Sequence, residues 1–235
     1  MDDLEKYETL EVTMAPDSGV QLCHLTQEQI QEELEKVLLK VQKPSVFFEV
    51  LRQMDQLDHW FPELKALIGV KQPPSYHAEG DAWTHTMMVL DQAAAFRHRT
   101  ADPYGFMLSA LAHDLGKAVC DRDENGVVNA YGHEALGLPL AEAFLRRITQ
   151  DKKHIGYVWN MVAYHMMPHV AARAGSSVEV TNQMFRQSVD PEGLVCLALA
   201  DDRGCVSQEE SIDPEPFLRE RLRIFRETTK TETDK

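Results

Sequence analysis

The chain has few cysteines and no long apolar run. Its four cysteines are scattered along 235 residues without a Cys-x-x-Cys pair, a pattern that excludes a zinc ribbon and suggests no disulfide framework. No stretch approaches the roughly 18 apolar residues that span a bilayer. The acidic first residues also lack the apolar core of a signal peptide. We therefore expect a cytoplasmic chain with reduced thiols and no membrane partner.

The chain also lacks an excess of positive charge. It has 24 Lys and Arg residues and 38 Asp and Glu residues, which gives a formal net charge of -14. Binding along a nucleic-acid backbone depends on clustered Lys and Arg, so we do not expect a long nucleic acid as a partner. A small nucleotide is compatible with this charge, because a bound divalent cation attracts phosphate to an acidic protein.

Strand patterns are almost absent, apart from a short hairpin suggested by the turn residues Asn125 and Gly126. Apolar residues instead recur at helical spacing in nearly every segment, which predicts an all-α fold. Thr26 and Gln29 form a capping-box pattern at the start of the first helix. We expect helices over about 26–42, 45–61, 82–98, 106–119, 133–148, 153–167, 190–202 and 215–228, a short helical turn over 63–68, and a loop with a short helix over 171–189.

Prolines mark several of these boundaries. Pro62 is expected to end the second helix, and Pro168 to end the helix that begins near residue 153. Pro139 is expected to kink its helix or to mark a second start. Asp190 followed by Pro191 is a strong start signal, since aspartate caps the helix and proline suits its first position.

The most informative stretch is His113-Asp114-Leu115-Gly116-Lys117, inside the apolar run from Phe106 to Val119. On a continuous helix His113 shares a face with Lys117, four residues later. An imidazole nitrogen beside a carboxylate oxygen, in surroundings poor in water, can hold a small cation. A hydrogen-bonded core histidine next to a solvated aspartate is the alternative, so the case for a metal depends on residues elsewhere in the chain.

Further histidine and aspartate residues face inward on other predicted helices. His85 borders an apolar stripe, His133 lies in line with packed residues, and His165 follows the apolar Val162 by three positions. Asp201 continues the apolar stripe of its helix, whereas Asp202 is turned by about 100°. Each residue alone is more typical of a structural role, but their convergence favours a metal centre.

The order of His85, His113-Asp114, His133, His165 and Asp201 resembles the HD superfamily of metal-dependent phosphohydrolases. In that family the first His, the His-Asp pair and the distal Asp hold one metal ion, and two intervening His residues hold a second. The resemblance implies an HD-domain helical bundle with two divalent ions per chain, chosen from Mn, Ni, Co, Fe and Mg. It also implies catalytic roles for Asp114 and Lys117, and a substrate-binding region that includes Lys117, His77 and Asp81.

The strings over 76–86 and 200–204 resemble, more narrowly, the HD domain of bacterial CCA-adding tRNA nucleotidyltransferases, and the likeness covers about 24–210. The chain has no Gly-Ser loop followed by the Asp-x-Asp pair that nucleotidyl transfer requires, and Gln29 stands where the family usually has an arginine. We therefore expect an HD domain without the nucleotidyltransferase head. The expected organisation is an irregular segment over 1–24, a helical extension over 25–70, the HD domain over 71–229 and a frayed tail over 230–235.

The resemblance implies a phosphatase or phosphodiesterase that acts on nucleotides, including 2',3'-cyclic phosphates, through metal-activated water. Two alternatives stay open. One is a noncatalytic metal-containing module that binds nucleotide, tRNA or protein, although the chain's acidity disfavours tRNA and its full ligand set disfavours a retired site. The other is a nucleotide pyrophosphohydrolase or dNTP triphosphohydrolase, which uses the same chemistry on a different bond.

Overall fold

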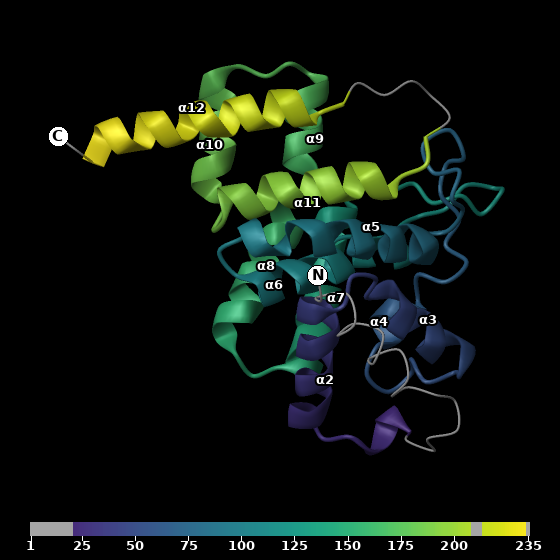
Figure 1. Cartoon of the computed structure of the whole chain (residues 1–235). Helices are drawn as coiled ribbons and strands as arrows, with labels where there is room; N and C mark the ends of the chain where they lie inside the picture. Colours follow the sequence, from purple (N-terminus) through teal and green to yellow (C-terminus); the bar gives the residue numbers. More distant parts are fainter. Residues whose placement is uncertain (1–20, 208–212, 234–235) are drawn as a thin grey trace, which may run out of the picture.

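The computed structural model describes residues 21–207 and 213–233, and the regular elements in these ranges are all helical (Figure 1). Most of the irregular segment expected over 1–24 lies outside the described residues. The described elements are η1 (Leu22–His24), α2 (Gln27–Lys40), α3 (Ser45–Gln53), α4 (Pro62–Lys65), α5 (Ala82–Phe96), η2 (Arg97–Arg99), α6 (Pro103–Ala112), η3 (Leu115–Ala118), α7 (His133–Ile148), α8 (Lys152–Tyr164), α9 (Met166–Arg173), α10 (Val178–Gln187), α11 (Pro191–Gly204) and α12 (Glu215–Thr233).

The prediction of an all-α fold is confirmed. Within the described ranges the only β-type pairings are isolated bridges, and no strand or sheet forms. The expected hairpin around Asn125 and Gly126 is reduced to a tight turn with one bridge between Arg122 and Val128. No helix in the described part of the chain combines the length and apolar character needed to cross a membrane.

The centre of the molecule is the packing of α5 against α11. The two helices lie side by side across the middle of the view, with α9, α10 and α12 above them and α2, α3 and α4 below (Figure 1). Their close approach depends on Gly204, because a Cβ atom there would lie 2.7 Å from the backbone nitrogen of Val89. One continuous apolar core extends from Leu34 in α2 to Leu222 in α12, and it surrounds the helix ends that carry the histidines.

Several helix starts agree with the capping signals in the sequence. Thr26 and Gln29 form both hydrogen bonds of a capping box at the start of α2. The Asp190 carboxylate accepts a hydrogen bond from the Gly193 N–H and caps α11, whose first residue is Pro191. These local signals define where a helix begins, because they satisfy backbone N–H groups that have no partner within the helix.

The predicted helix over 45–61 is wrong after Gln53. Asp55 adopts a left-handed conformation with φ 52°, and the Gln56 N–H donates to the Leu51 carbonyl oxygen at 2.9 Å, as at many helix C-termini. Leu57 is buried although it lies outside any helix. The helical spacing of the apolar residues therefore persists in the sequence beyond the point where the helix has ended.

The expectation about Pro168 also fails. Pro168 does not end a helix, because it lies at the third position of α9, where a missing N–H is tolerated. The actual break falls at His165, between α8 and α9. Pro139 lies inside α7, which continues as one element from His133 to Ile148 without a second start.

The C-terminal helix is longer than expected. α12 reaches Thr233, so most of the tail expected to fray over 230–235 is helical, and the last two residues lie outside the described ranges. Leu218 and Leu222 anchor α12 in the core. The helix thereby covers α10 and one flank of α11 (Figure 1).

Candidate metal centre

The His-Asp pair lies at a break between two helical elements, and the predicted continuous helix from Phe106 to Val119 is wrong. α6 ends at Ala112, His113 is its last residue of helical conformation, and Asp114 has φ -104° and ψ 7°. The chain then tightens into the 3-10 turn η3, in which the Lys117 N–H donates to the Asp114 carbonyl oxygen at 2.9 Å. This break turns the Asp114 side chain away from the direction it would take on a continuous helix.

Close packing of η3 against α7 explains the break. A Cβ atom at Gly116 would collide with the backbone carbonyl oxygen of His133 and would lie 2.7 Å from the backbone nitrogen of Gly137. Only a glycine allows the two backbones to approach this closely. The contact brings an Asp114 carboxylate oxygen to 3.1 Å from His133 Nε2.

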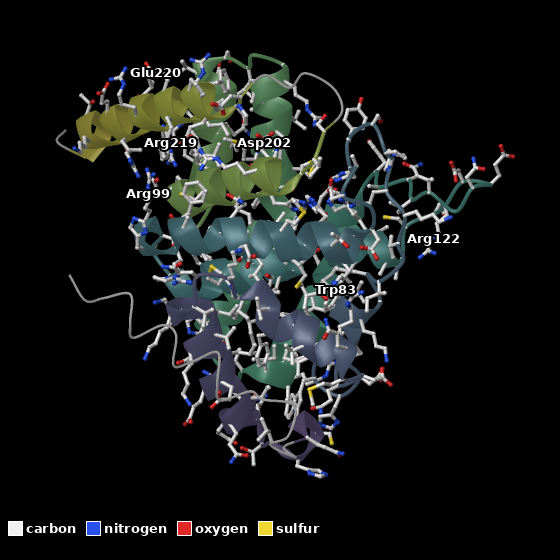
Figure 2. The ribbon with its side chains drawn as sticks, turned by 45° about the vertical axis from the view of Figure 1, so that its right-hand side comes forward. Trp83, Arg99, Arg122, Asp202, Arg219 and Glu220 are labelled. Carbon is white, nitrogen blue, oxygen red and sulfur yellow. The ribbon has the colours of Figure 1, made fainter. Side chains whose placement is uncertain are left out.

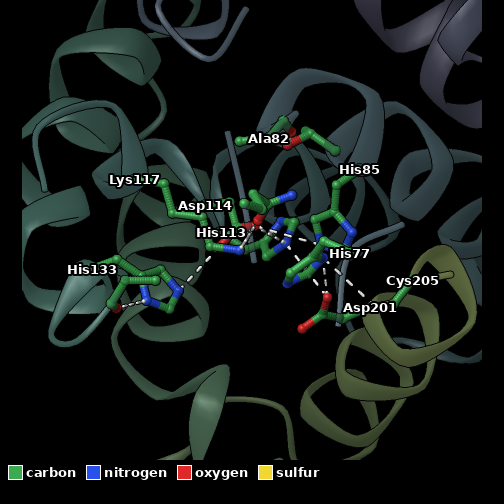
Figure 3. A network of polar contacts seen from close by, with 12 residues as sticks. His77, Ala82, His85, His113, Asp114, Lys117, His133, Asp201 and Cys205 are labelled. Atoms are coloured by element: carbon green, nitrogen blue, oxygen red, sulfur yellow. Dashed lines mark hydrogen bonds and ion pairs between the residues drawn. The ribbon is translucent and has the colours of Figure 1, made fainter. Parts of the chain in front are cut away.

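The first group of ligand candidates comes from three parts of the chain (Figure 3). His85 Nε2, from α5, lies 2.9 Å from Asp201 Oδ1 and 3.5 Å from Asp114 Oδ2. His113 Nε2 lies 3.3 Å from Asp114 Oδ2 and 3.9 Å from Asp201 Oδ1. The structure thus brings together the four residues that the sequence assigned to a first metal ion.

The second group consists of Asp114, His133 and His165. His133 Nε2 lies 3.1 Å from Asp114 Oδ1 and 3.0 Å from His165 Nε2. Asp114 belongs to both groups, with Oδ2 directed to the first and Oδ1 to the second. A carboxylate in this position is suited to bridge two cations.

The imidazole rings are held in fixed orientations. The Nδ1 atoms of His113, His133 and His165 each lie within hydrogen-bond distance of the backbone carbonyl oxygen three residues earlier, at 2.9, 2.7 and 2.7 Å. If Nδ1 carries the proton and donates it to that carbonyl, Nε2 keeps its lone pair and faces the centre. Such a second contact is the usual way in which a metal-binding histidine is oriented.

The charges of the centre depend on one another. Burial raises the pKa of the Asp114 carboxyl, but the neighbouring His113 and Lys117 outweigh it and hold this pKa well below its usual value. Burial similarly opposes ionisation of Asp201, whose pKa is nevertheless lowered by His169 and His85. Both carboxylates are therefore ionised at neutral pH, as metal ligands must be.

The histidines divide into two types. Burial lowers the pKa of His85, but contacts with Asp201 and Glu79 outweigh it and raise this pKa to about 9. Burial, together with the charges on His113 and His133, lowers the pKa of His165 to about 3. In the metal-free chain a proton on His85 therefore balances part of the buried negative charge, whereas His165 stays neutral.

Unsatisfied polar atoms support a cation at this centre. His85 Nε2, His113 Nε2 and Asp114 Oδ2 are buried, and none of them forms a hydrogen bond of good geometry with other described residues, although His85 Nε2 lies 2.9 Å from Asp201 Oδ1 and Asp114 Oδ2 lies 2.7 Å from Lys117 Nζ. Buried polar atoms normally have partners, and leaving them without one is costly. Three such atoms converge, and the candidate ligand atoms of His85, His113 and Asp114 lie within 4.8 Å of one another, as do those of Asp114, His133 and His165. This mixture of imidazole and carboxylate donors fits a divalent ion of the Mn, Fe, Co or Ni type.

The predicted substrate residues occupy different positions. Lys117 is buried, and its Nζ lies 2.7 Å from both Asp114 Oδ2 and Gln72 Oε1. His77 lies at the rim, with its ring 4.8 Å from the ring of His85 (Figure 3). Asp81 instead caps α5, because its two carboxylate oxygens accept hydrogen bonds from the N–H groups of Thr84 and Gly69.

Asp201 and Asp202 also differ in position. The Asp201 side chain is 16% exposed and faces His85. Asp202 is half-buried, and burial raises the pKa of its carboxyl group. The neighbouring Arg203 forms an ion pair with Glu215.

Sequence reasoning did not assign two residues that contact the ligand candidates. Glu79 Oε1 lies 3.1 Å from His85 Nδ1 and 2.8 Å from His77 Nδ1. His169 Nε2 lies 2.9 Å from Asp201 Oδ2. Glu79 could be recognised in the sequence, because it lies two residues after His77 and six residues before His85. His169 could not, because Pro168 was expected to end the helix just before it.

Known proteins with related sequences provide independent information. A protein called "Multifunctional CCA protein" from Shewanella frigidimarina is 39% identical over 212 residues, which cover 88% of this chain and 50% of the relative. Proteins of the same name from Shewanella denitrificans and Mannheimia succiniciproducens are 33% and 30% identical, over 83% and 92% of this chain. The chain is homologous to part of the multifunctional CCA proteins.

The chain spans about half the length of the multifunctional CCA proteins that it matches, covering 46% and 54% of the two relatives from S. denitrificans and M. succiniciproducens. No protein-family model matches the chain. The homology agrees with the likeness to the HD domain of CCA-adding enzymes that the strings over 76–86 and 200–204 suggest. Buried histidine and aspartate clusters that could hold metal ions agree with the same likeness.

Proposed function

We propose that the chain is a metal-dependent phosphohydrolase that cleaves phosphate esters of nucleotides, including 2',3'-cyclic phosphates. The observation that carries this proposal is the pair of ligand groups that share Asp114 at the base of one centre. Two cations held by one carboxylate can flank a phosphoryl group, an arrangement typical of phosphate-ester hydrolysis. The homology to multifunctional CCA proteins favours a nucleotide as the substrate.

In this proposal His85, His113, Asp114 and Asp201 hold one ion, and Asp114, His133 and His165 hold the other. When bound, such ions supply Lewis acidity and lower the pKa of a coordinated water. Mn, Ni, Co, Fe and Mg are the candidates, and two ions per chain is the expected number. The buried neighbours of the centre exclude bulk water, which strengthens every electrostatic contact with the substrate.

Lys117 is the residue best placed to neutralise a phosphoryl oxygen. Its ammonium group lies next to Asp114 and is only 7% exposed, so a phosphate that reaches the carboxylate also reaches this cation. Lys117 acts there as a point charge that stabilises the negative charge developing in the transition state. The Gln72 side chain, at 2.7 Å, orients Lys117 from the other side.

His77 lies at the rim of the centre, where a nucleobase or ribose of the substrate could contact it. Its side chain is 18% exposed and is oriented by Glu79. Asp81 has no comparable position, since capping of α5 occupies its carboxylate. We therefore assign substrate contacts to Lys117 and His77 and leave Asp81 with its structural role.

The proposal is tested by a hydrolysis screen on the purified chain. Each candidate metal is combined with 2',3'-cyclic nucleotides, nucleoside monophosphates and nucleoside triphosphates, with a chelator as the blank. His113→Ala should abolish turnover and weaken metal binding. His98→Ala is the matched control, since His98 is exposed on η2.

Each outcome separates the proposal from its alternatives. Metal-dependent turnover of cyclic or monoester substrates, lost in His113→Ala, supports it. Turnover restricted to triphosphates would favour a pyrophosphohydrolase or triphosphohydrolase. Tight metal binding without turnover of any substrate would favour a noncatalytic module.

The net charge led us to expect no long nucleic acid as a partner. The homology to CCA proteins does not support that expectation, so tRNA belongs among the candidate partners.

A further inference from the structure

A cleft remote from the metal centre gathers positive charge. It has a volume of about 260 Å³ and lies between η2, the first turn of α11 and residues 219–230 of α12. Its cationic lining side chains are Arg99, Arg219, Arg223, Arg226 and Lys230. In Figure 2 Arg99 and Arg219 lie close together on the left of the molecule, on the side opposite Arg122.

Glu192 organises the floor of this cleft. Its carboxylate lies 2.9 Å from Arg99, 2.6 Å from Arg219 and 2.6 Å from Arg226. Burial raises the pKa of Glu192, but the neighbouring arginines outweigh it and lower this pKa. One ionised carboxylate therefore holds three guanidinium groups in place before any ligand arrives.

The local charge is opposite to that of the whole chain. Five cationic side chains line the cleft with two carboxylates, Glu192 and Glu227, and Glu215 and Glu220 pair with Arg219 and Arg223 beside it. These groups still leave a small positive excess, whereas the chain carries a net charge of -14. A cleft of one sign focuses the local field and attracts ligands of the opposite sign, even where the net charge of the protein repels them. The cleft is therefore suited to an anionic partner despite the acidity of the chain.

The arginines keep donors for a ligand. Among the described residues, Arg99 and Arg226 each contact Glu192 through a single terminal nitrogen, Nη2. An arginine carries five N–H donors in a planar fork, so both side chains have donors beyond the nitrogen that contacts Glu192. Their side chains are 39% and 56% exposed. Several guanidinium groups held at one place form the arrangement that binds adjacent phosphates.

We propose that this cleft binds the phosphate backbone of a nucleic-acid strand. The cleft is open and lined by several arginines, so it suits successive phosphates along a strand better than a single enclosed anion. Glu192 and Asp201 lie at opposite ends of α11, nine residues apart, which corresponds to about 14 Å along a helix. The cleft is thus separate from the residues assigned to hydrolysis and makes no contribution to the metal centre.

The test is the binding of a labelled single-stranded RNA of about 12 nucleotides to the full chain, measured by fluorescence anisotropy with a chelator present to prevent hydrolysis. Arg99→Gln and Arg226→Gln should each weaken binding about five- to tenfold. Each should also reduce the slope of log affinity against log salt by about 0.7. Arg226→Lys keeps the charge but loses the planar fork of donors, so it should keep the salt slope of the wild type and retain only part of the affinity.

Arg146→Gln is the matched control, since Arg146 is 64% exposed on α7 and pairs with Glu142. Equal RNA binding by the wild type, both Gln variants and the control would overturn the proposal. So would inorganic pyrophosphate binding as tightly as RNA, or arginine-dependent binding to phosphatidylserine vesicles without RNA binding. Thermal melting confirms that the variants fold, and hydrolysis of a mononucleotide should be unchanged in both, which keeps this test independent of the proposed hydrolysis.

Discussion

Glu79 can affect the proposed metal centre through His85, and it also forms, with His77 and His85, a further group that could hold a metal ion. It contacts Nδ1 of both His77 and His85, while its other oxygen accepts a hydrogen bond from the Val206 N–H at 2.9 Å. Hydrogen bonds with His85, Val206 and His77 overcome burial and lower the pKa of Glu79 to about 2. The Glu79 carboxylate is therefore ionised at neutral pH and lies in contact with His85 Nδ1.

Glu79→Gln removes this charge while keeping the shape of the side chain. We expect metal affinity to fall by about 10- to 100-fold, because His85 loses the partner that fixes its orientation and basicity. Isothermal titration with Mn²⁺ or Ni²⁺ measures the change. Glu142→Gln, on the exposed side of α7, is the control. Unchanged affinity in Glu79→Gln would show that His85 needs no such support or is not a ligand.

Asp201 and Asp202 provide a second comparison of neighbouring residues. Asp201→Ala should abolish hydrolysis and strongly weaken metal binding, since it removes a charge that faces His85 and His113. Asp202→Ala should change the stability of the fold by no more than about 0.5 kcal/mol, as expected for a residue without a buried partner. Metal titration and hydrolysis assays on both variants decide the point. Equal losses would indicate that the two carboxylates share the role.

At the scale of elements, the contact between η3 and α7 is the most sensitive point described. Gly116→Ala should destabilise the chain by several kcal/mol, because the added methyl group would meet backbone atoms that cannot move without shifting α7. Urea unfolding of the metal-free chain measures this loss. Gly156→Ala is the control, since among the described residues the added group meets no atom within 4 Å apart from its own stretch of helix, and alanine favours the interior of α8. That variant should gain up to about 1 kcal/mol.

The helices could be predicted where local signals and packing agree. Asp190 with Pro191 marked the start of α11, and the start of α2 followed from the Thr26 capping box. Helical periodicity could not reveal the break at Asp114, because it results from a contact between Gly116 and a segment more than 15 residues away. Local sequence does not report such tertiary contacts.

The composition of the metal centre was easier to predict than its surroundings. Inward-facing His and Asp residues are conspicuous because few such side chains are buried without a partner. The residues that support the ligand candidates look ordinary in the sequence. Glu79 resembles a surface carboxylate, and Gln72 lies in a connector, between Lys71 and the prolines Pro73 and Pro74. Only the folded arrangement shows that these side chains contact His85 and Lys117.

At the scale of the whole molecule, the buried titratable groups predict a stability maximum near pH 6.5 for the metal-free chain. The raised pKa of His85, about 9, stabilises the fold below pH 6.5, and this contribution is lost as pH rises through 9. The lowered pKa of His165, about 3, acts in the opposite direction. As pH falls below 6.5 the unfolded chain binds a proton that the folded chain does not, so stability decreases.

Urea unfolding between pH 5 and 9.5 should therefore show lower stability at both limits, by about 1 to 3 kcal/mol. His85→Gln should flatten the alkaline side. Adding metal should shift the maximum upward in pH, because bound ions compete with protons for the same nitrogen atoms. A profile that stays flat across this range would contradict the charge states assigned to both histidines.

The proposed ligands come from distant parts of the chain, the starts of α5 and α7 and the C-terminal ends of α6, α8 and α11. An ion bound to these ligands would hold the five helices together, because it would restrain the segments between them as a cross-link restrains a long loop. Amide hydrogen exchange in all five segments should then slow together when metal is added. Departure of the ion would need a partial opening of the bundle, so the protein should release its metal slowly and lose it first where local unfolding begins.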